Sequence, residues 1–324
     1  MSNKLARTID EFMKQAGTAK AIDAATPQPE SPTSLLVVDA EKWAVIGVDV
    51  FAGSTKTTAH IPAAVYEVNI SDRYGIIFSK RRPITDKLIR FPDSQGDYVL
   101  ESIVAFWNAK PQFVKRGQVF KRGVLMWGPA GSGKTCITAQ LMQDVIDRGG
   151  IVIYTKYGPE VLASALQLVR KIEQNKPIVC VVEDIDEVIN RHGEHSLLAM
   201  LDGEDQIDCV VHVATTNFPE RLGARLLARP SRFDEIVKVD MPSPQARRIY
   251  FTNQFTSGEL ADLDLNRWVK DTEGMSLAMC RELVVAIYCL DRNYQDTIER
   301  LRALSKQPQS EPEFTKASSV GFAK

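Results

Sequence analysis

The segment Gly128–Thr135, GPAGSGKT, has the composition and spacing of a phosphate-binding loop. It follows the apolar run VLMW and precedes the helical run CITAQLMQDVI, and this motif requires such a strand before it and a helix after it. Its glycines allow successive backbone N–H groups to converge on phosphate oxygens, and the N-terminus of the next helix adds partial positive charge. The sequence therefore predicts a site for the phosphates of a nucleotide.

The last two residues of this loop predict a metal beside the nucleotide. Lys134 would reach the terminal phosphates, and Thr135 would place its hydroxyl on Mg²⁺, a cation that prefers oxygen ligands and keeps several waters. The residues predicted to hold the nucleotide in this loop are Gly128, Pro129, Ala130, Gly131, Ser132, Gly133, Lys134 and Thr135.

A pair of carboxylates follows the apolar run PIVCVV. Acidic side chains at the end of a buried parallel strand beside such a loop orient hydrated Mg²⁺ and activate water. By position, Glu183 takes the magnesium role and Asp184 the general-base role, although aspartate is one methylene shorter and needs the water drawn closer. An alternative register uses Asp186 and Glu187, which lie beyond the end of the strand at Val182.

Strands and helices alternate around these motifs, a pattern typical of a parallel sheet covered on both faces. Helices dominate from Ser243 onward and predict a lid. The predicted fold is an α/β module with a five-stranded parallel sheet between helices and a helical lid. Its predicted strands are Val124–Trp127, Ile151–Thr155, Ile178–Val182, Val210–Ala214 and Glu235–Val239.

The N-terminal part lacks the alternation of strands and helices and contains runs of strand-forming residues separated by turn residues. These runs are SLLVV, KWAVIGVDV, AVYEVNI, RYGIIFSK and KLIRF. We predict a small β-rich domain there, preceded by a short amphipathic helix and a linker rich in proline and serine. The polar, proline-containing tail is predicted to be disordered. The predicted segments are helix 1–22, linker 23–34, β-rich domain 35–96, α/β domain 97–242, lid 243–305 and tail 306–324.

Composition excludes several classes of protein. Hydrophobic residues make up 44% and charged residues 25%, with a formal net charge of -1, so nothing in the charge points to nucleic acid or membrane. No apolar stretch approaches the length needed to cross a bilayer. The five cysteines are widely spaced and form no CxxC pair, which predicts reduced thiols and a cytoplasmic protein.

The loop, the acidic strand end and the downstream segments VATTN and LLARPSRFD together resemble the AAA module of the AAA+ superfamily, over roughly Asp97 to Leu304. The resemblance implies an ATPase that uses ATP and Mg²⁺ and assembles as a homo-oligomeric ring, a hexamer. The family usually has Asp followed by Glu at the strand end. Here the order is Glu183 and then Asp184, which resembles the mitochondrial Rieske-protein translocase subgroup.

The resemblance also assigns residues outside the loop. Asn217 would be the sensor that hydrogen-bonds the attacking water or the terminal phosphate. Arg229 and Arg232 would be arginine fingers that reach a neighbouring subunit's site. In the lid segment EGMSLAMCREL, Ala278 would face the nucleotide, whereas Arg281 is interpreted as structural.

One family feature is missing from the sequence. Protein-threading members carry an aromatic-hydrophobic-glycine loop that grips substrate, but the segment 157–177 reads as one helix without an internal aromatic-glycine pair. Tyr157 with Gly158 is a substitute, although a tyrosine before a helix start is interpreted here as a packed side chain. Processive unfolding is therefore not the first hypothesis.

Three functions are compatible with these motifs. The first is an ATPase that remodels or positions a protein partner, bound through the helix 1–22 or the β-rich domain. The second is a DNA-transaction ATPase, which leaves nucleic acid open as a partner. The sequence contains no basic patch that would support this function. The third is an ATP-dependent scaffold that scarcely hydrolyses, for which the short base Asp184 would be the reason.

Overall fold

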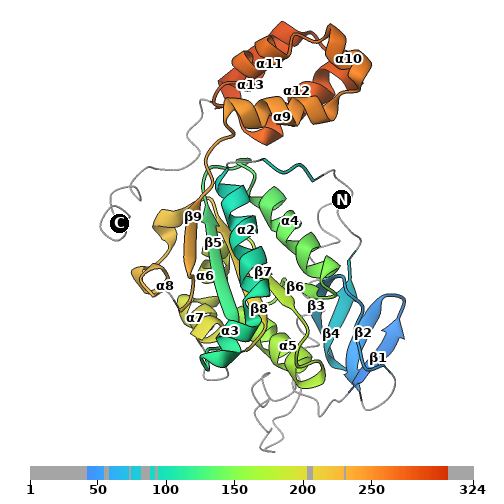
Figure 1. The fold of residues 1–324 in the computed structure, drawn as a ribbon, viewed down its shortest axis with the longest axis vertical. Helices are drawn as coiled ribbons and strands as arrows, with labels where there is room; N and C mark the ends of the chain where they lie inside the picture. Colours follow the sequence, from blue (N-terminus) through green and yellow to red (C-terminus); the bar gives the residue numbers. More distant parts are fainter. Residues whose placement is uncertain are drawn as a thin grey trace, which may run out of the picture.

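The computed structural model describes residues 42–54, 58–72, 74–81, 88–91, 94–202, 207–229 and 231–305. The predicted helix 1–22, the linker 23–34, the strand SLLVV and the tail 306–324 lie outside the described residues. One nine-stranded sheet runs through the body, in the order β1-β2-β4-β3-β6-β7-β8-β5-β9. A helical lid stands at one end of this body (Figure 1).

The five predicted strands of the α/β part are all present and mutually parallel. The central strands are the most buried because helices cover both faces: β7 is apolar along its whole length, and all seven residues of β8 are buried. The register places Val124 of β5 opposite Val213 of β8 and Glu235 of β9. Their bounds are β5 (Lys121–Trp127), β6 (Ile151–Thr155), β7 (Ile178–Val182), β8 (Val210–Thr216) and β9 (Glu235–Lys238).

The N-terminal β-rich region is present, and it extends the central sheet instead of forming a detached one. Strand β3 pairs in parallel with β6, from Val65 opposite Val152 to Val68 opposite Thr155. This pairing satisfies the backbone groups that β6 would otherwise expose as an edge strand. The four strands are β1 (Lys42–Gly47), β2 (Val50–Ser54), β3 (Val65–Ser71) and β4 (Gly75–Lys80).

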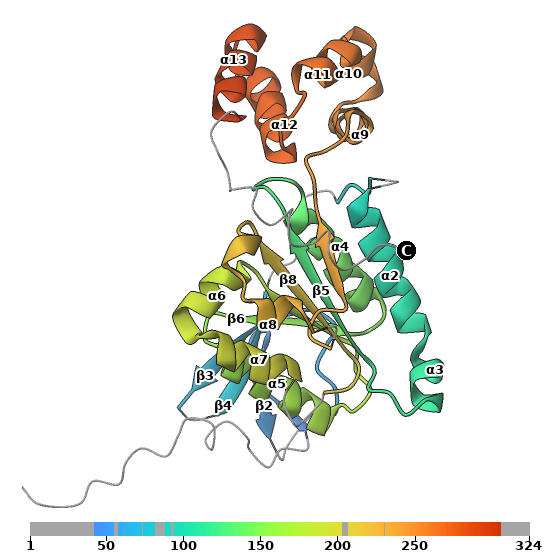
Figure 2. The ribbon, with the colours of Figure 1, turned by 90° about the vertical axis from the view of Figure 1, so that its left-hand side faces the viewer.

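Helices cover both faces of the sheet (Figure 2). The two faces carry separate apolar clusters. One face carries α2 (Gln95–Asn108) and α4 (Lys134–Asp147), while the short α3 (Lys110–Lys115) follows α2. The opposite face carries α5 (Pro159–Ile172), α6 (Ile185–His192), α7 (Glu194–Asp202) and α8 (Ala224–Leu227). A short 3-10 turn, Pro219–Arg221, connects β8 to α8.

The lid follows β9 after a short connection and has its own apolar core, built around Phe251, Trp268 and Leu283. Side-chain caps define where its helices begin, as at Ser243 and at the Thr256–Glu259 capping box. Its elements are α9 (Pro244–Gln254), α10 (Ser257–Asp262), α11 (Leu265–Asp271), α12 (Leu277–Val284), a π-helical turn (Val285–Cys289) and α13 (Tyr294–Ser305).

The prediction of a strand in KLIRF is wrong for its described part, Leu88–Phe91, which has no regular structure. Tertiary contacts override its strand-forming composition. The Ile89 side chain is buried in the core of the lid, while its carbonyl accepts a hydrogen bond from Gln140 Nε2 of α4 at 3.1 Å. This segment therefore connects the lid to the helix that follows the phosphate loop.

A buried carboxylate, Glu173, fastens the N-terminal strands to the end of α5. Its Oε1 accepts hydrogen bonds from Trp43 Nε1 and from the Ile61 N–H, both at 2.9 Å. Its Oε2 pairs with Lys176 at 2.9 Å and with His60 at 3.0 Å. Burial would raise the pKa of Glu173, but the Ile61 N–H and Lys176 outweigh that effect and lower it.

We expect Glu173→Gln to lower the free energy of unfolding by about 2 kcal/mol, because an amide presents a donor where four donors converge. Urea denaturation at pH 7 measures this. The pKa of Glu173 is lower in the folded state than its unfolded value of 4.5. The carboxylate therefore contributes fully to stability above pH 4.5, and this contribution is lost as the pH falls through the folded-state pKa. The difference between the two proteins should therefore shrink in acid. Glu101→Gln, at a side chain 69% exposed, is the control.

Candidate functional site

The phosphate loop lies between the end of β5 and the start of α4. Its glycines adopt left-handed φ values of 149° at Gly128, 75° at Gly131 and 116° at Gly133. A Cβ added at Gly128 would come within 2.2 Å of the Val239 carbonyl oxygen, so a side chain is excluded there. The Gly131 carbonyl accepts the N–H of Leu277 at 3.2 Å, and the first turn of the lid helix α12 therefore contacts the loop.

Lys134 links the loop to the strand beside it. Its ammonium donates to the carbonyls of Gly128 at 2.7 Å and Pro129 at 2.9 Å, and to Asn217 Oδ1 at 2.7 Å. Burial lowers the pKa of Lys134 to about 8, and the charge of Asp184 opposes this change. The structure thus brings together the predicted phosphate ligand and the predicted sensor, which are far apart in the sequence.

The two carboxylates follow β7 without a gap. Asp184 has a left-handed φ of 46° at the start of α6, and its N–H donates to Thr215 Oγ1 at 3.4 Å. Both side chains reach solvent, yet the surrounding walls desolvate them enough to raise the pKa of Glu183 and of Asp184. The charge of Asp184 also raises the pKa of Glu183, whereas Arg81 acts in the opposite direction.

The alternative pair of carboxylates lies elsewhere. Asp186 is buried, accepts a hydrogen bond from Thr216 Oγ1 at 2.7 Å and pairs with Arg221 at 3.3 Å. Glu187 is exposed on α6 and pairs with Arg191 of the same helix. Glu183 and Asp184 share one cleft with Lys134 and Asn217, whereas Glu187 lines only a neighbouring cleft.

This cleft has a volume of about 610 Å³ and lies between the body and the lid. The loop residues Lys134 and Thr135, the two carboxylates, Asn217 and Ala278 all line it. Sequence reasoning missed an apolar wall formed by Leu88, Ile89, Phe91 and Tyr250. The run of apolar residues in KLIRF was the available signal, but it was interpreted as a strand.

The side chains present fit a nucleotide with Mg²⁺. The glycine loop leaves room for phosphate oxygens, Lys134 provides a cation, and Thr135 and Glu183 provide hard oxygen donors. Among the described residues no group of three or more His, Cys, Asp or Glu could hold a metal ion alone. A metal here would therefore depend on phosphate oxygens and water, as Mg²⁺ does in phosphate sites.

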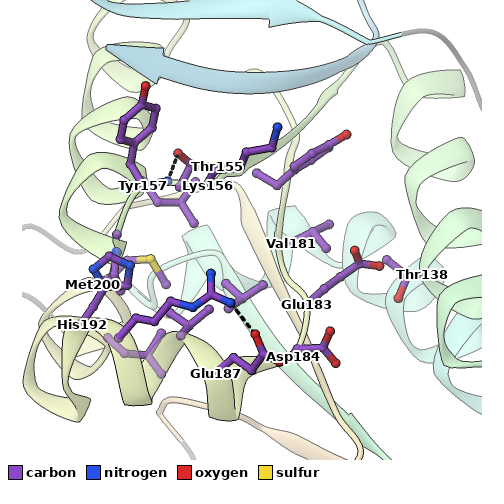
Figure 3. Close-up of a pocket in the computed structure, with 18 of the residues that line it drawn as sticks. Thr138, Thr155, Lys156, Tyr157, Val181, Glu183, Asp184, Glu187, His192 and Met200 are labelled. Carbon is purple, nitrogen blue, oxygen red and sulfur yellow. Dashed lines mark hydrogen bonds and ion pairs between the residues drawn. The ribbon is translucent and has the colours of Figure 1, made fainter. Parts of the chain in front are cut away.

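A second cleft, also of about 610 Å³, continues beyond the carboxylates (Figure 3). It shares Thr135, Glu183 and Asp184 with the first cleft, so these three side chains lie on the wall between the two. Its far side is formed by the start of α5 and by α6 and α7, where Tyr157, His192 and Met200 are seen in Figure 3.

Comparison with known proteins agrees with this geometry. Residues 124–241 match the family described as ATPase family associated with various cellular activities (AAA). These residues form an AAA ATPase domain. The match includes the phosphate loop, both carboxylates and Asn217, and it ends as the lid begins.

The relatives of this AAA domain are longer proteins. The chain is 28% identical to the ATP-dependent zinc metalloprotease FtsH 2 of Petrotoga mobilis, over 66% of this chain and 36% of that protein. It is 28% identical to the mitochondrial inner membrane i-AAA protease supercomplex subunit YME1 of Saccharomyces cerevisiae, over 60% of this chain and 28% of that protein. Thus the chain spans only about a third of these relatives. Among the described residues, no helix is long and apolar enough to cross a membrane.

The two predicted arginine fingers of the AAA domain differ in their surroundings. Arg229 is exposed. Arg232 is only 6% exposed, pairs with Asp202 at 2.5 Å and donates to the carbonyl of Arg225. Only Arg229 is therefore presented on the surface of the single subunit.

The loop before α5 also differs from expectation. Tyr157 was interpreted as packed, which is wrong, because its side chain is 44% exposed on the rim of the second cleft. The proline that starts α5 fixes the chain direction after Gly158 and leaves the tyrosine outside the helix. Helix α5 itself runs unbroken over Pro159–Ile172 and contains no aromatic residue.

We expect Lys134→Ala to abolish ATP binding, because the ammonium is the main cation of the AAA domain's phosphate site. Binding of a fluorescent ATP analogue, measured by titration, checks this. Lys156→Ala, which removes a side chain 78% exposed on the second cleft, is the matched control. Unchanged affinity in Lys134→Ala would refute the assignment of the loop.

Proposed function

We propose that this chain is an ATPase that works as a hexameric ring and remodels or positions a protein partner. The observation that supports it most is the single cleft that gathers Lys134, Glu183, Asp184 and Asn217 under a lid that contributes Ala278. A site made by two rigid parts changes shape when a nucleotide binds between them. Such a change can be transmitted to a partner.

The roles within the cleft follow from position and chemistry. Lys134 would neutralise the terminal phosphates, and Thr135 with Glu183 would hold Mg²⁺, which neutralises charge on the phosphate oxygens when bound. Asp184 would accept the proton of the attacking water. Asn217, already in contact with Lys134, would orient that water or the terminal phosphate.

The ring supplies the remaining charge in this proposal. A guanidinium from the neighbouring subunit neutralises charge that spreads over the transferring phosphoryl group. Arg229 is suited to this role because it is exposed. Arg232, which is buried against Asp202, would instead hold the segment between α8 and β9 in place.

Arg229→Ala should retain ATP binding but lower turnover by about a thousandfold, the usual range for an arginine finger. The measurement is steady-state phosphate release at saturating ATP, with analytical ultracentrifugation to check assembly. Arg232→Ala should also lower turnover, but with a lower melting temperature, since it leaves Asp202 without its partner. Arg225→Ala, at an exposed arginine on α8, is the control. Normal turnover in Arg229→Ala would refute the finger role.

Two finer points belong to the same proposal. The order Glu183 then Asp184 supports kinship with the Rieske-protein translocase subgroup. The unbroken α5, which contains no aromatic residue, supports a client that is not threaded. A scaffold with little turnover is the second candidate, because Asp184 is a short base; the turnover number separates it from the first.

The client can be trapped on a variant that binds ATP without hydrolysing it. Asp184→Asn, loaded with ATP in cell extract, should retain a specific protein that Lys134→Ala does not retain. Mass spectrometry identifies the protein, and the purified protein should then change the ATP turnover of the wild-type ring. Recovery of nuclease-sensitive DNA instead of protein would favour the DNA-transaction alternative.

A further inference from the structure

Thr138 lies on α4 three residues after Thr135, so the two side chains project from the same face of the helix. The axial separation of the two residues is about 4.5 Å. Thr135 lines both clefts, whereas Thr138 lines only the second one. Thr138 therefore lies directly behind the residue that is expected to contact Mg²⁺.

The hydroxyl of Thr138 is a buried polar group without a partner. The residue is 2% exposed, and its Oγ1 makes no hydrogen bond among the described residues. A threonine inside a helix usually bonds the carbonyl one turn earlier, but this bond is not made here. Valine would fill the same space without burying an unsatisfied hydroxyl, so the hydroxyl indicates a partner that binds in the cleft.

Glu183 lies at the same end of this cleft. Figure 3 shows Thr138 and Glu183 together on one side, away from Tyr157 and His192. Within the described part of the chain, the Glu183 carboxylate also makes no hydrogen bond or ion pair. Two oxygen-bearing side chains thus flank the space next to Thr135, and neither is satisfied by the protein.

The dimensions of a hydrated magnesium ion are compatible with the helical spacing of Thr135 and Thr138. Mg²⁺ lies about 2.1 Å from its water ligands, and a hydrogen bond from such a water to a hydroxyl spans about 2.8 Å. A hydroxyl one helical turn beyond Thr135 can therefore accept from the metal's water, or donate to the carboxylate that holds it. Outer hydrogen bonds of this kind orient metal ligands.

We propose that Thr138 is a positioning residue for the magnesium site. Its hydroxyl would hold the Glu183 carboxylate and a water of the hydrated ion in place. The proposal rests on the proposed ATPase function and adds a residue to it. Glutamate has one more rotatable bond than aspartate, so its carboxylate needs additional contacts to be fixed. When the hydrated ion is bound, the Thr138 hydroxyl would supply such a contact to Glu183.

The charges around this end of the cleft are compatible with that role. Arg81, at the end of β4, stacks over the Tyr154 ring at 4.3 Å and pairs with Glu67 at 3.0 Å. Lys156 pairs with the same Glu67 at 3.2 Å. These two cations are therefore engaged with Glu67, and Glu183 is left available for the metal.

The test is the magnesium dependence of nucleotide binding, which does not require turnover. A fluorescent ATP analogue is titrated into the full chain at increasing Mg²⁺, with EDTA as the metal-free limit. Thr138→Val should raise the half-saturating Mg²⁺ concentration about tenfold while metal-free binding stays unchanged. Thr138→Ser, which keeps the hydroxyl, should stay within about twofold of wild type.

Controls separate this role from packing. Thr297→Val removes a hydroxyl that is equally buried in the lid, 3% exposed and bonded to Asn293, and it should not change the magnesium dependence. Melting temperatures report whether each variant folds, and Thr138→Ala is a second hydroxyl-free variant. Wild-type magnesium dependence in both hydroxyl-free variants, or an equal shift in Thr138→Ser, would overturn the proposal. A wild-type chain that binds no nucleotide at any Mg²⁺ concentration would refute the ATPase function itself.

Discussion

The site depends on the parallel pairing of β5, β7 and β8, because parallel strands end at the same edge of a sheet. The register sets Trp127 opposite Thr216 and Val182 opposite Ala214. The loops that follow these strands therefore begin at nearly the same level. This places the phosphate loop, the carboxylates and Asn217 in one cleft, although 83 residues separate Lys134 from the asparagine it contacts.

The N-terminal strands are part of this same construction. Because β3 pairs with β6, the end of β4 brings Arg81 to the cleft beyond the carboxylates. At the other end of α5, Glu173 binds Trp43 and Ile61 of the same N-terminal region. The region expected to meet a partner is thus joined to the ATPase sheet by backbone pairing and by a buried carboxylate.

Local features of the sequence were predictable because their causes are local. The phosphate loop follows from glycine spacing, the central strands from burial on both faces, and the start of the lid from a helix cap. The strand predicted in KLIRF failed because of a contact between distant residues: the lid core buries Ile89. The pairing of Arg232 with Asp202 is another such contact, and the finger role of Arg232 stays a prediction. No periodicity in the sequence records such partners.

The exchanged order of the two carboxylates affects both predicted roles, that of Asp184 and that of Glu183. At the position predicted for the general base, the shorter Asp184 has a left-handed backbone conformation at the start of α6. At the position predicted for the magnesium ligand, the longer Glu183 makes no hydrogen bond or ion pair among the described residues. If these roles hold, the exchanged order gives the metal ligand the extra rotatable bond that the family usually places in the base. An enzyme with this arrangement has to restrain that ligand from its surroundings, and the unsatisfied hydroxyl of Thr138 lies where such a restraint would act.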